Sequence, residues 1–242
     1  MTGEAPRIDR IDRIVVGIPA KDEATSIVAC LESVAASARR VAVPVHIVVV
    51  DDDSSDATAA LARSALASVP ANTAGQVLTL GCGTAGAARA VAFGRGIAAA
   101  RRPDTTWLAS TDADTVVGPD WLAHHLRWAW AGLDGVAGLV EVAWRPEQAQ
   151  LAALFQASMR EMGTEEGHGH VHGANLGLRA SRWIQVGGCD ESGDGEDHDL
   201  WRRLLAAGAR LHGATDLPVV TSSRLIGRVP AGFSGYLRSL GR

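Results

Sequence analysis

The sequence has only three cysteines, no block of basic residues and no apolar run long enough to cross a bilayer. The cysteines are odd in number, widely spaced and without a CxxC pair. This pattern excludes a disulfide framework and predicts small core residues in a reduced, cytoplasmic protein. Without a basic block, neither nucleic acid nor an anionic membrane surface is an expected partner. No transmembrane segment is expected, and the first thirteen residues lack the apolar run of a signal peptide.

A linker rich in proline or serine, a long repeat and a low-complexity tract are also missing. The 242 residues carry a formal net charge of −4, with acids and bases mixed along the chain. A chain of this length can bury the core of one large α/β domain or of two small ones, and no linker separates two halves. We therefore expect a single domain over residues 1–242.

In the first half, apolar segments alternate with segments of helical periodicity. Strands are predicted over residues 13–20, 43–56, 75–81 and 105–111, and helices over 22–40, 56–69 and 84–102, the last interrupted by Gly94 and Gly96. The strands are apolar on both faces, which is typical of a parallel sheet covered by helices. Such a sheet binds ligands at the carboxyl ends of its strands.

The second half is less regular. It predicts a helix over 119–132 that starts at Pro119, a strand over 133–144, a helix over 147–163, a short strand over 174–180 and a helix over 196–208. The basic, glycine-containing tail from Arg224 onward is expected to be mobile.

The segment TDADT, residues 111–115, places Asp112 and Asp114 one residue apart where a buried strand ends. If the strand continues, both carboxylates point to one face. A hard cation such as Mg²⁺ takes one or two carboxylates together with ligand phosphates and water, and would relieve their repulsion. The alternative is a solvated turn, since Asp and Thr favour turns.

A second acidic segment, DDDSSD, occupies residues 51–56, where the apolar part of the second predicted strand ends. Asp51 ends that strand and could accept a hydrogen bond from the N–H of a nucleobase. Ser54, Ser55 and Asp56 are suited to cap the following helix, so a helix-capping loop is the alternative.

The segment GCGTAG, residues 81–86, matches the GxGxxG pattern between a strand and a helix. It supports an alternative function, an oxidoreductase that uses NAD(P) or a flavin. Against this, the match follows the third strand, and no acidic residue ends the next strand at the ribose position.

Two further polar segments lie in the second half. His168, His170 and His172 alternate, so they could bind zinc with Glu165 or Glu166, but three in-line histidines fit a tetrahedral site poorly and a loop beside a polar pocket is favoured. Glu196, Asp197 and Asp199 open a helix. They form either an acidic first turn stabilised by the helix dipole or a source of a general base.

Six segments in order together resemble the family-2 glycosyltransferases, over roughly residues 13 to 215: VVGIPAKDEATSI, IVVVDDDSSDAT, TAGAARAVAFGRG, TDADTVVGPDWL, HGANLGLRASRWIQVGGCDE and GEDHDLWRRLLAAGARL. The resemblance implies a GT-A fold, with a nucleotide-binding half over 13–115 and an acceptor-binding half with the tail over 116–242. It implies transfer of a sugar from a nucleotide-diphosphate donor, with UDP as the default nucleotide, to an acceptor hydroxyl with inversion. The acceptor, small molecule or lipid, stays open, and Mg²⁺ or Mn²⁺ is the implied cofactor.

The resemblance also assigns roles to single residues. It places Pro19, Ala20 and Glu23 around the nucleotide, Asp51 at the base and Arg89 near the nucleotide. Asp112 and Asp114 match the DxD pair, with Asp114 the firmer metal ligand, and Asp197 matches the general base beside Glu196. His172, Gly173 and Asn175 are the expected contacts of the donor sugar or the acceptor.

The chain departs from the family pattern at several positions. Asp22 and Ala90 stand where the family commonly has asparagine, and no histidine follows His212 to serve as a late metal ligand. Ser222 with Arg224 or Arg228 is then expected to meet the diphosphate. Besides the oxidoreductase, a non-catalytic relative that binds nucleotide sugar remains an alternative.

Overall fold

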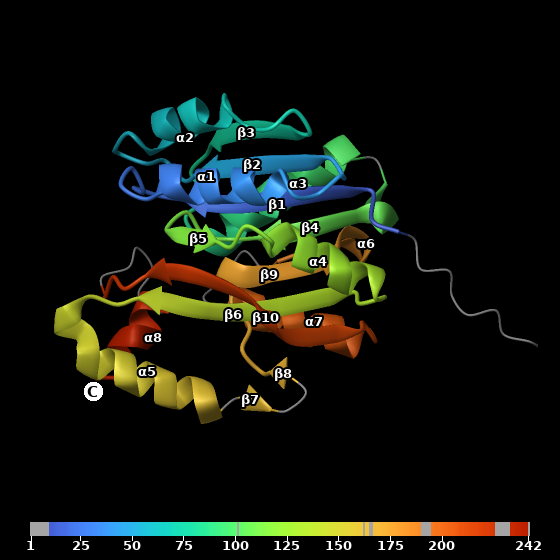
Figure 1. Cartoon of the computed structure of the whole chain (residues 1–242). Coiled ribbons are helices and arrows are strands. Elements are labelled where there is room, and N and C mark those ends of the chain that lie inside the picture. The colour runs from blue at the N-terminus through green and yellow to red at the C-terminus, as the bar shows by residue number, and fades with distance from the viewer. Residues whose placement is uncertain are drawn as a thin grey trace, which may run out of the picture.

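The computed structural model describes residues 10–100, 102–161, 163–164, 167–189, 195–225 and 233–241. Its centre is an eight-stranded sheet in the order β3-β2-β1-β4-β9-β6-β10-β5 (Figure 1). The strands are β1 (Arg13–Ala20), β2 (Val45–Asp51), β3 (Thr73–Thr79), β4 (Thr106–Ser110), β5 (Thr115–Val117), β6 (Gly135–Ala143), β9 (Leu176–Arg179) and β10 (Leu211–Ser222). Only β9 and β5 run antiparallel to their neighbours, so the sheet is mostly parallel, as predicted.

Helices cover both faces of the sheet. On one face α1 (Ile27–Ala38), α2 (Thr58–Leu66) and α4 (Trp121–Trp130) share a core with β1 and β2. On the other, α3 (Ala85–Ala100), α6 (Ala180–Gln185) and α7 (Glu196–Ala206) pack against the sheet. Buried β-branched residues fill both faces of β1 and β2, which explains why these strands read as continuous apolar runs.

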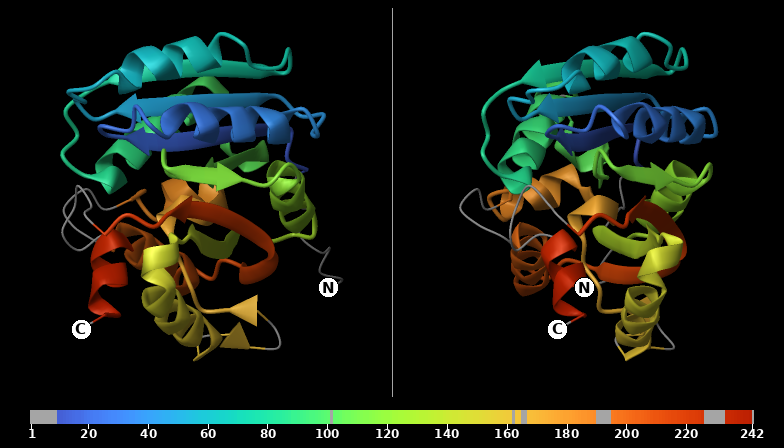
Figure 2. Two further views of the ribbon diagram at one scale, coloured as in Figure 1. Left: turned by 60° about the vertical axis from the view of Figure 1, so that its left-hand side comes forward. Right: turned by 90° about the vertical axis from the view of Figure 1, so that its left-hand side faces the viewer.

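A third, smaller cluster lies beside the last strands. It joins α5 (Ala149–Glu161) to α8 (Phe233–Ser239) through Phe155, Phe233, Tyr236 and Leu237. Figure 2 shows α8 next to α5. The short strands β7 (Gly163–Thr164) and β8 (Gly167–His168) form a separate hairpin. Short 3-10 turns span Pro103–Thr105, Pro146–Gln148 and Gly173–Asn175.

The structure corrects several predicted boundaries. The first helix begins at Ile27 rather than at residue 22, and Pro119 precedes the helix, whose N-cap is Asp120. The predicted second strand ends at Asp51, so DDDSSD is a loop after its first residue. The described part of the tail includes α8, and β10 was not predicted, because its alternation of exposed and buried residues passes through Gly213 and Pro218.

The predicted interruption of the third helix is also wrong, because α3 is continuous from Ala85 to Ala100. A methyl group at Gly96 would lie 2.2 Å from Val15 Cγ1 of β1, whereas one at Gly94 would meet nothing within 4 Å. One glycine therefore allows the helix to approach the sheet, while the other only lowers helix propensity.

These two glycines form a matched pair of variants. We expect Gly96→Ala to lower the free energy of unfolding by about 1–3 kcal/mol through overpacking. Gly94→Ala should raise it by up to ~1 kcal/mol through helix propensity. Urea denaturation followed by circular dichroism measures both. Equal stability of the two variants would show that α3 does not pack closely on β1.

None of the helices in the described ranges is long and apolar enough to span a membrane. Of the three cysteines, Cys30 and Cys189 are buried and Cys82 is partly exposed. Two of them are thus small core residues, as the composition predicts.

Candidate active site

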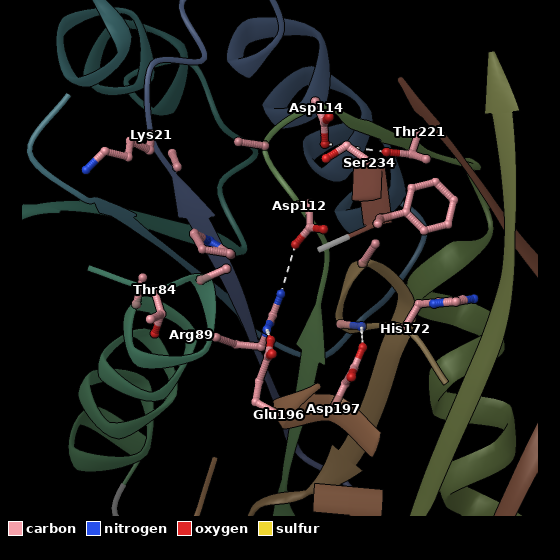
Figure 3. Close-up of a pocket in the computed structure, with 18 of the residues that line it drawn as sticks. Lys21, Thr84, Arg89, Asp112, Asp114, His172, Glu196, Asp197, Thr221 and Ser234 are labelled. Atoms are coloured by element: carbon pink, nitrogen blue, oxygen red, sulfur yellow. Dashed lines mark hydrogen bonds and ion pairs between the residues drawn. The ribbon is translucent and has the colours of Figure 1, made fainter. Parts of the chain in front are cut away.

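A pocket of about 660 Å³ opens at the carboxyl ends of the strands (Figure 3). Its walls come from the loops after β1, β2 and β4, the end of β10, the first turns of α3 and α7, and α8. Six carboxylates and three permanent cations line it: Glu23, Asp52, Asp112, Asp114, Glu196 and Asp197, with Lys21, Arg89 and Arg224. The excess of carboxylates gives the pocket a negative field, which attracts cations.

Arg89 lies at the floor of the pocket with only 3% of its side chain exposed. Its Nε donates to Ser110 Oγ at 2.7 Å, its Nη2 to Asp112 Oδ1 at 2.9 Å, and its Nη1 to Glu196. These contacts join α3, β4 and α7 through one guanidinium. A buried cation of this kind is stable only because it is paired on several sides.

Asp112 and Asp114 both line the pocket, but not as two residues of a strand. β4 ends at Ser110, and the pair lies in the turn that leads into β5. Asp112 pairs with Arg89, whereas Asp114 accepts hydrogen bonds from Thr221 and Ser222 and pairs with Arg224. The strand therefore does not continue through the pair, although both carboxylates reach the same pocket.

The ionisation of Asp112 is shifted by its surroundings. Burial raises the pKa of the carboxyl group to about 6, with Asp114 and Glu196 acting in the same direction and Arg89 opposing them. About a third of the side chain stays open to the pocket, and water there limits the size of the shift.

The donor set fits a hard divalent cation. Asp112 and Asp114 supply carboxylate oxygens, and Thr221 and Ser222 supply hydroxyl oxygens beside Asp114. Mg²⁺ and Mn²⁺ prefer such ligands and take their remaining ones from phosphate and water. Within the described residues, no group of three or more His, Cys, Asp or Glu side chains forms a complete metal site. A cation here would thus depend on ligands from the bound donor.

Asp197 and Glu196 begin α7. Asp197 Oδ2 accepts the backbone N–H of Gly173 at 2.8 Å, and Oδ1 accepts that of His198 at 2.8 Å. These bonds fix the carboxylate at the pocket wall next to the Gly173 turn. Glu196 instead points to Arg89. Figure 3 shows Asp114 and Asp197 toward opposite ends of the site, with Asp112 between them.

His170 and His172 line the pocket, and His168 lies behind them, where its Nε2 contacts the carbonyl oxygen of Ala214. Burial lowers the pKa of His172 to about 4 against the opposing attraction of Asp197, so the ring is neutral at pH 7. Glu165 and Glu166, the further ligands of the alternative zinc site, lie outside the described residues.

The structure does not bring every predicted residue to the pocket. Asp51 is 1% exposed and absent from the lining, where Asp52 takes its place. Asn175 is fully buried, donates to the carbonyls of Leu139 and Leu217, and accepts from Trp121 Nε1. Its expected contact with sugar or acceptor is therefore wrong, because it fastens the turn before β9 to the sheet. Pro19, Ala20, Glu23 and Gly173 do line the pocket.

Asp52 was missed by sequence reasoning. Its Oδ1 accepts the backbone N–H groups of Cys82 and Gly83 at 2.5 and 2.9 Å, and Lys21 Nζ lies 3.3 Å from its Oδ2. Burial raises the pKa of Asp52, but the two amides and Lys21 outweigh it and lower the pKa overall. The GCGTAG turn is thus held to the loop after β2 by this carboxylate.

The replacement of the family's asparagine by Asp22 has a local explanation. Asp22 has φ +51°, a left-handed conformation that Asp and Asn tolerate better than most residues. Its Oδ1 also accepts bonds from the N–H and the hydroxyl of Ser55. Aspartate therefore keeps the turn that an asparagine would make.

Residues 15–148, which are 134 of the 242, match the glycosyl transferase family 2. The chain belongs to this family. The motifs that suggested it include those now seen around the pocket. No curated protein matches the chain significantly.

Solved structures similar to this family-2 glycosyltransferase show the same fold. The mannosyltransferase PcManGT from Pyrobaculum calidifontis, in complex with GDP-Man and Mn²⁺, has a TM-score of 0.60 and 20% identity over 89% of this chain and 58% of its own. S. aureus TarS 1-349 in complex with UDP has a TM-score of 0.62 and 15% identity over 88% and 61%. GalNAc-T7 with UDP, GalNAc and Mn²⁺ has a TM-score of 0.58 and 15% identity over 93% and 45%. These matches confirm the expected GT-A fold, and the chain spans about 60% or less of the length of these structures.

Proposed function

We propose that this chain transfers a sugar from a nucleoside-diphosphate sugar to an acceptor hydroxyl, with inversion and with a divalent cation. The observation that carries the proposal is the placement of Asp114 and Asp197 in one acidic pocket at the carboxyl edge of the sheet. We place the cation and the diphosphate on the side of Asp114. We place the acceptor hydroxyl, which must lose a proton, on the side of Asp197.

The nucleotide is proposed to lie along the loops after β1 and β2. Pro19, Ala20 and Glu23 line that side, and Asp52 replaces Asp51 as the proposed acceptor of a base N–H. Mn²⁺ accompanies the nucleotide sugar in the solved mannosyltransferase complex, which supports a divalent cation here. UDP and GDP are both candidate donor nucleotides, with UDP as the first choice.

The proposed reaction is a direct displacement. Asp197, held by the N–H groups of Gly173 and His198, accepts the proton of the acceptor hydroxyl. The acceptor oxygen then bonds to the anomeric carbon while the bond to the diphosphate breaks, which inverts the configuration. A cation bound at Asp112 and Asp114 would supply Lewis-acid stabilisation of the leaving diphosphate. The pocket walls hold both substrates in line, and such positioning supplies part of the rate.

A thermal-shift experiment tests donor binding. UDP or GDP with Mn²⁺ is expected to raise the melting temperature, because a ligand at a hundred times its Kd stabilises by about 2.7 kcal/mol. For a domain of this size that corresponds to roughly 5–10 °C. NAD(P) without metal is the matched control for an oxidoreductase that uses GCGTAG. A shift with NAD(P) and none with any nucleoside diphosphate would contradict the proposal.

A further inference from the structure

Arg224 enters the pocket just after β10 and contacts carboxylates from two other segments. Its Nη1 lies 2.5 Å from Glu23 Oε1, in the loop after β1, and its Nη2 lies 3.1 Å from Asp114 Oδ2, in the turn after β4. The two carboxylate side chains are only 6% and 10% exposed, and the arginine is 34% exposed. The guanidinium therefore neutralises the carboxylates from the open side of the pocket.

The contacts of Asp114 come from the end of β10 and the residues just after it. Ser222 Oγ donates to Oδ2 at 2.7 Å, Thr221 Oγ1 lies 3.4 Å from Oδ1, and Arg224 shares Oδ2 with Ser222. The hydroxyl groups can also bind a cation through their oxygens, but a guanidinium has only donors and a fixed positive charge. A divalent cation cannot share Oδ2 with Arg224 without strong repulsion between the two charges.

We infer that Arg224 and the divalent cation are alternative partners of Asp114, and that the donor diphosphate receives Arg224 when the cation binds. The inference rests on the proposed function, because it needs a diphosphate in this pocket. A guanidinium fits phosphate oxygens in a bidentate arrangement, so the diphosphate offers Arg224 a partner of the same kind as Asp114. Cation and nucleotide then bind cooperatively. The cation frees Arg224 from Asp114 so that it can bind the diphosphate, and the diphosphate gives Arg224 a partner when the cation occupies Asp114.

The test is a Mn²⁺ titration followed by the electron paramagnetic resonance signal of free Mn²⁺, which needs no acceptor and no turnover. Wild type and Arg224→Met are titrated alone and with saturating UDP or GDP, and the Mn²⁺ that the same nucleotide binds without protein is subtracted. In wild type we expect the nucleotide to tighten Mn²⁺ binding on the order of tenfold or more. In Arg224→Met we expect Mn²⁺ alone to bind on the order of tenfold more tightly than in wild type, and the effect of the nucleotide to shrink.

Arg40→Met is the matched control. It removes the same charge from an ion pair with Asp120 in which both partners are about half exposed and neither lines the pocket. It should leave Mn²⁺ affinity unchanged. Arg224→Lys replaces Arg224→Met in the titration if the methionine variant does not fold. A lysine cannot bridge two carboxylates with a planar fork, so its Mn²⁺ affinity should lie between those of wild type and Arg224→Met.

Three results would overturn the inference. Mn²⁺ affinity in Arg224→Met, or in Arg224→Lys if the methionine variant does not fold, could equal or fall below that of wild type. It could instead tighten by the same factor with and without nucleotide, which a general loss of positive charge produces. Nucleotide could also leave the Mn²⁺ affinity of the wild type unchanged, which refutes the competition but leaves sugar transfer standing. If neither UDP nor GDP binds under any condition, the proposed function fails together with the inference.

Discussion

Asp197→Asn is expected to lower sugar transfer by about 10²–10⁴-fold while leaving donor binding in place, because a positioned general base contributes a factor of this size. The asparagine oxygen can replace Oδ2 and accept the N–H of Gly173, which ties α7 to the Gly173 turn, and only the local bond from the neighbouring N–H of His198 is lost. The pocket shape should therefore persist while proton removal is lost. Release of nucleoside diphosphate from a radiolabelled donor, in the presence of an acceptor panel or of water alone, measures the effect.

Asp199→Asn is the matched control for this variant. Asp199 lies in the first turn of the same helix, pairs with Arg202 and Arg203, and does not line the pocket. The same chemical change there should alter turnover by less than about twofold, as surface substitutions usually do little. Equal turnover by wild type and Asp197→Asn would show that Asp197 is not the general base. No turnover by wild type on any donor would favour a non-catalytic relative that binds nucleotide sugar.

Of the variants proposed for this protein, Arg89→Met should lower the free energy of unfolding the most. The change leaves Asp112 and Glu196 without their shared cation and Ser110 without its donor. Breaking a buried pair typically costs 3–5 kcal/mol, and we expect about 3 kcal/mol because Asp112 stays partly open to water. This corresponds to a drop in melting temperature of about 6–12 °C. Differential scanning calorimetry at neutral pH, without ligand, is the measurement.

Arg95→Met provides the comparison on the same helix. Arg95 makes an exposed hydrogen bond to Gln76, so its loss should change stability by no more than about 0.5 kcal/mol. Adding Glu196→Gln to Arg89→Met should restore part of the lost stability, because it removes one of the two stranded charges. If Arg89→Met melts as high as Arg95→Met, Arg89 does not hold the three elements together.

The first half of the fold and the identity of most acidic residues in the pocket could be predicted from the sequence. The runs that became β1 and β2 are apolar throughout, and the loops after them had to meet at one edge of a parallel sheet. Arg89, Asp112, Asp114 and Asp197 were found because their motifs occur in a fixed order. The resemblance to the family-2 glycosyltransferases assigned these residues, because local pattern alone left a solvated turn and an acidic helix start as alternatives.

The remaining features depended on register and on distant contacts. Successive side chains at a strand end point in opposite directions, so a difference of one residue decided whether Asp51 or Asp52 faced the pocket. The sequence has three consecutive aspartates here and does not show which of them faces the pocket. Asn175 was misassigned because its partners, Leu139 and Leu217, lie on strands far away in sequence. Arg224 reaches Asp114 only because β10 lies beside β5 in the sheet.

The tight packing beside Arg89 restricts how the pocket could be redesigned. A methyl group at Gly173 would lie 2.5 Å from Arg89 Nη2, and one at Gly86 would lie 2.7 Å from Glu196 Cγ. Neither position has room for a side chain, so libraries that vary these two positions should yield mostly inactive clones. Phe233, Ser234 and Tyr236 line the pocket from the short α8 instead. Laboratory evolution toward new substrates should therefore accumulate its accepted changes in that helix.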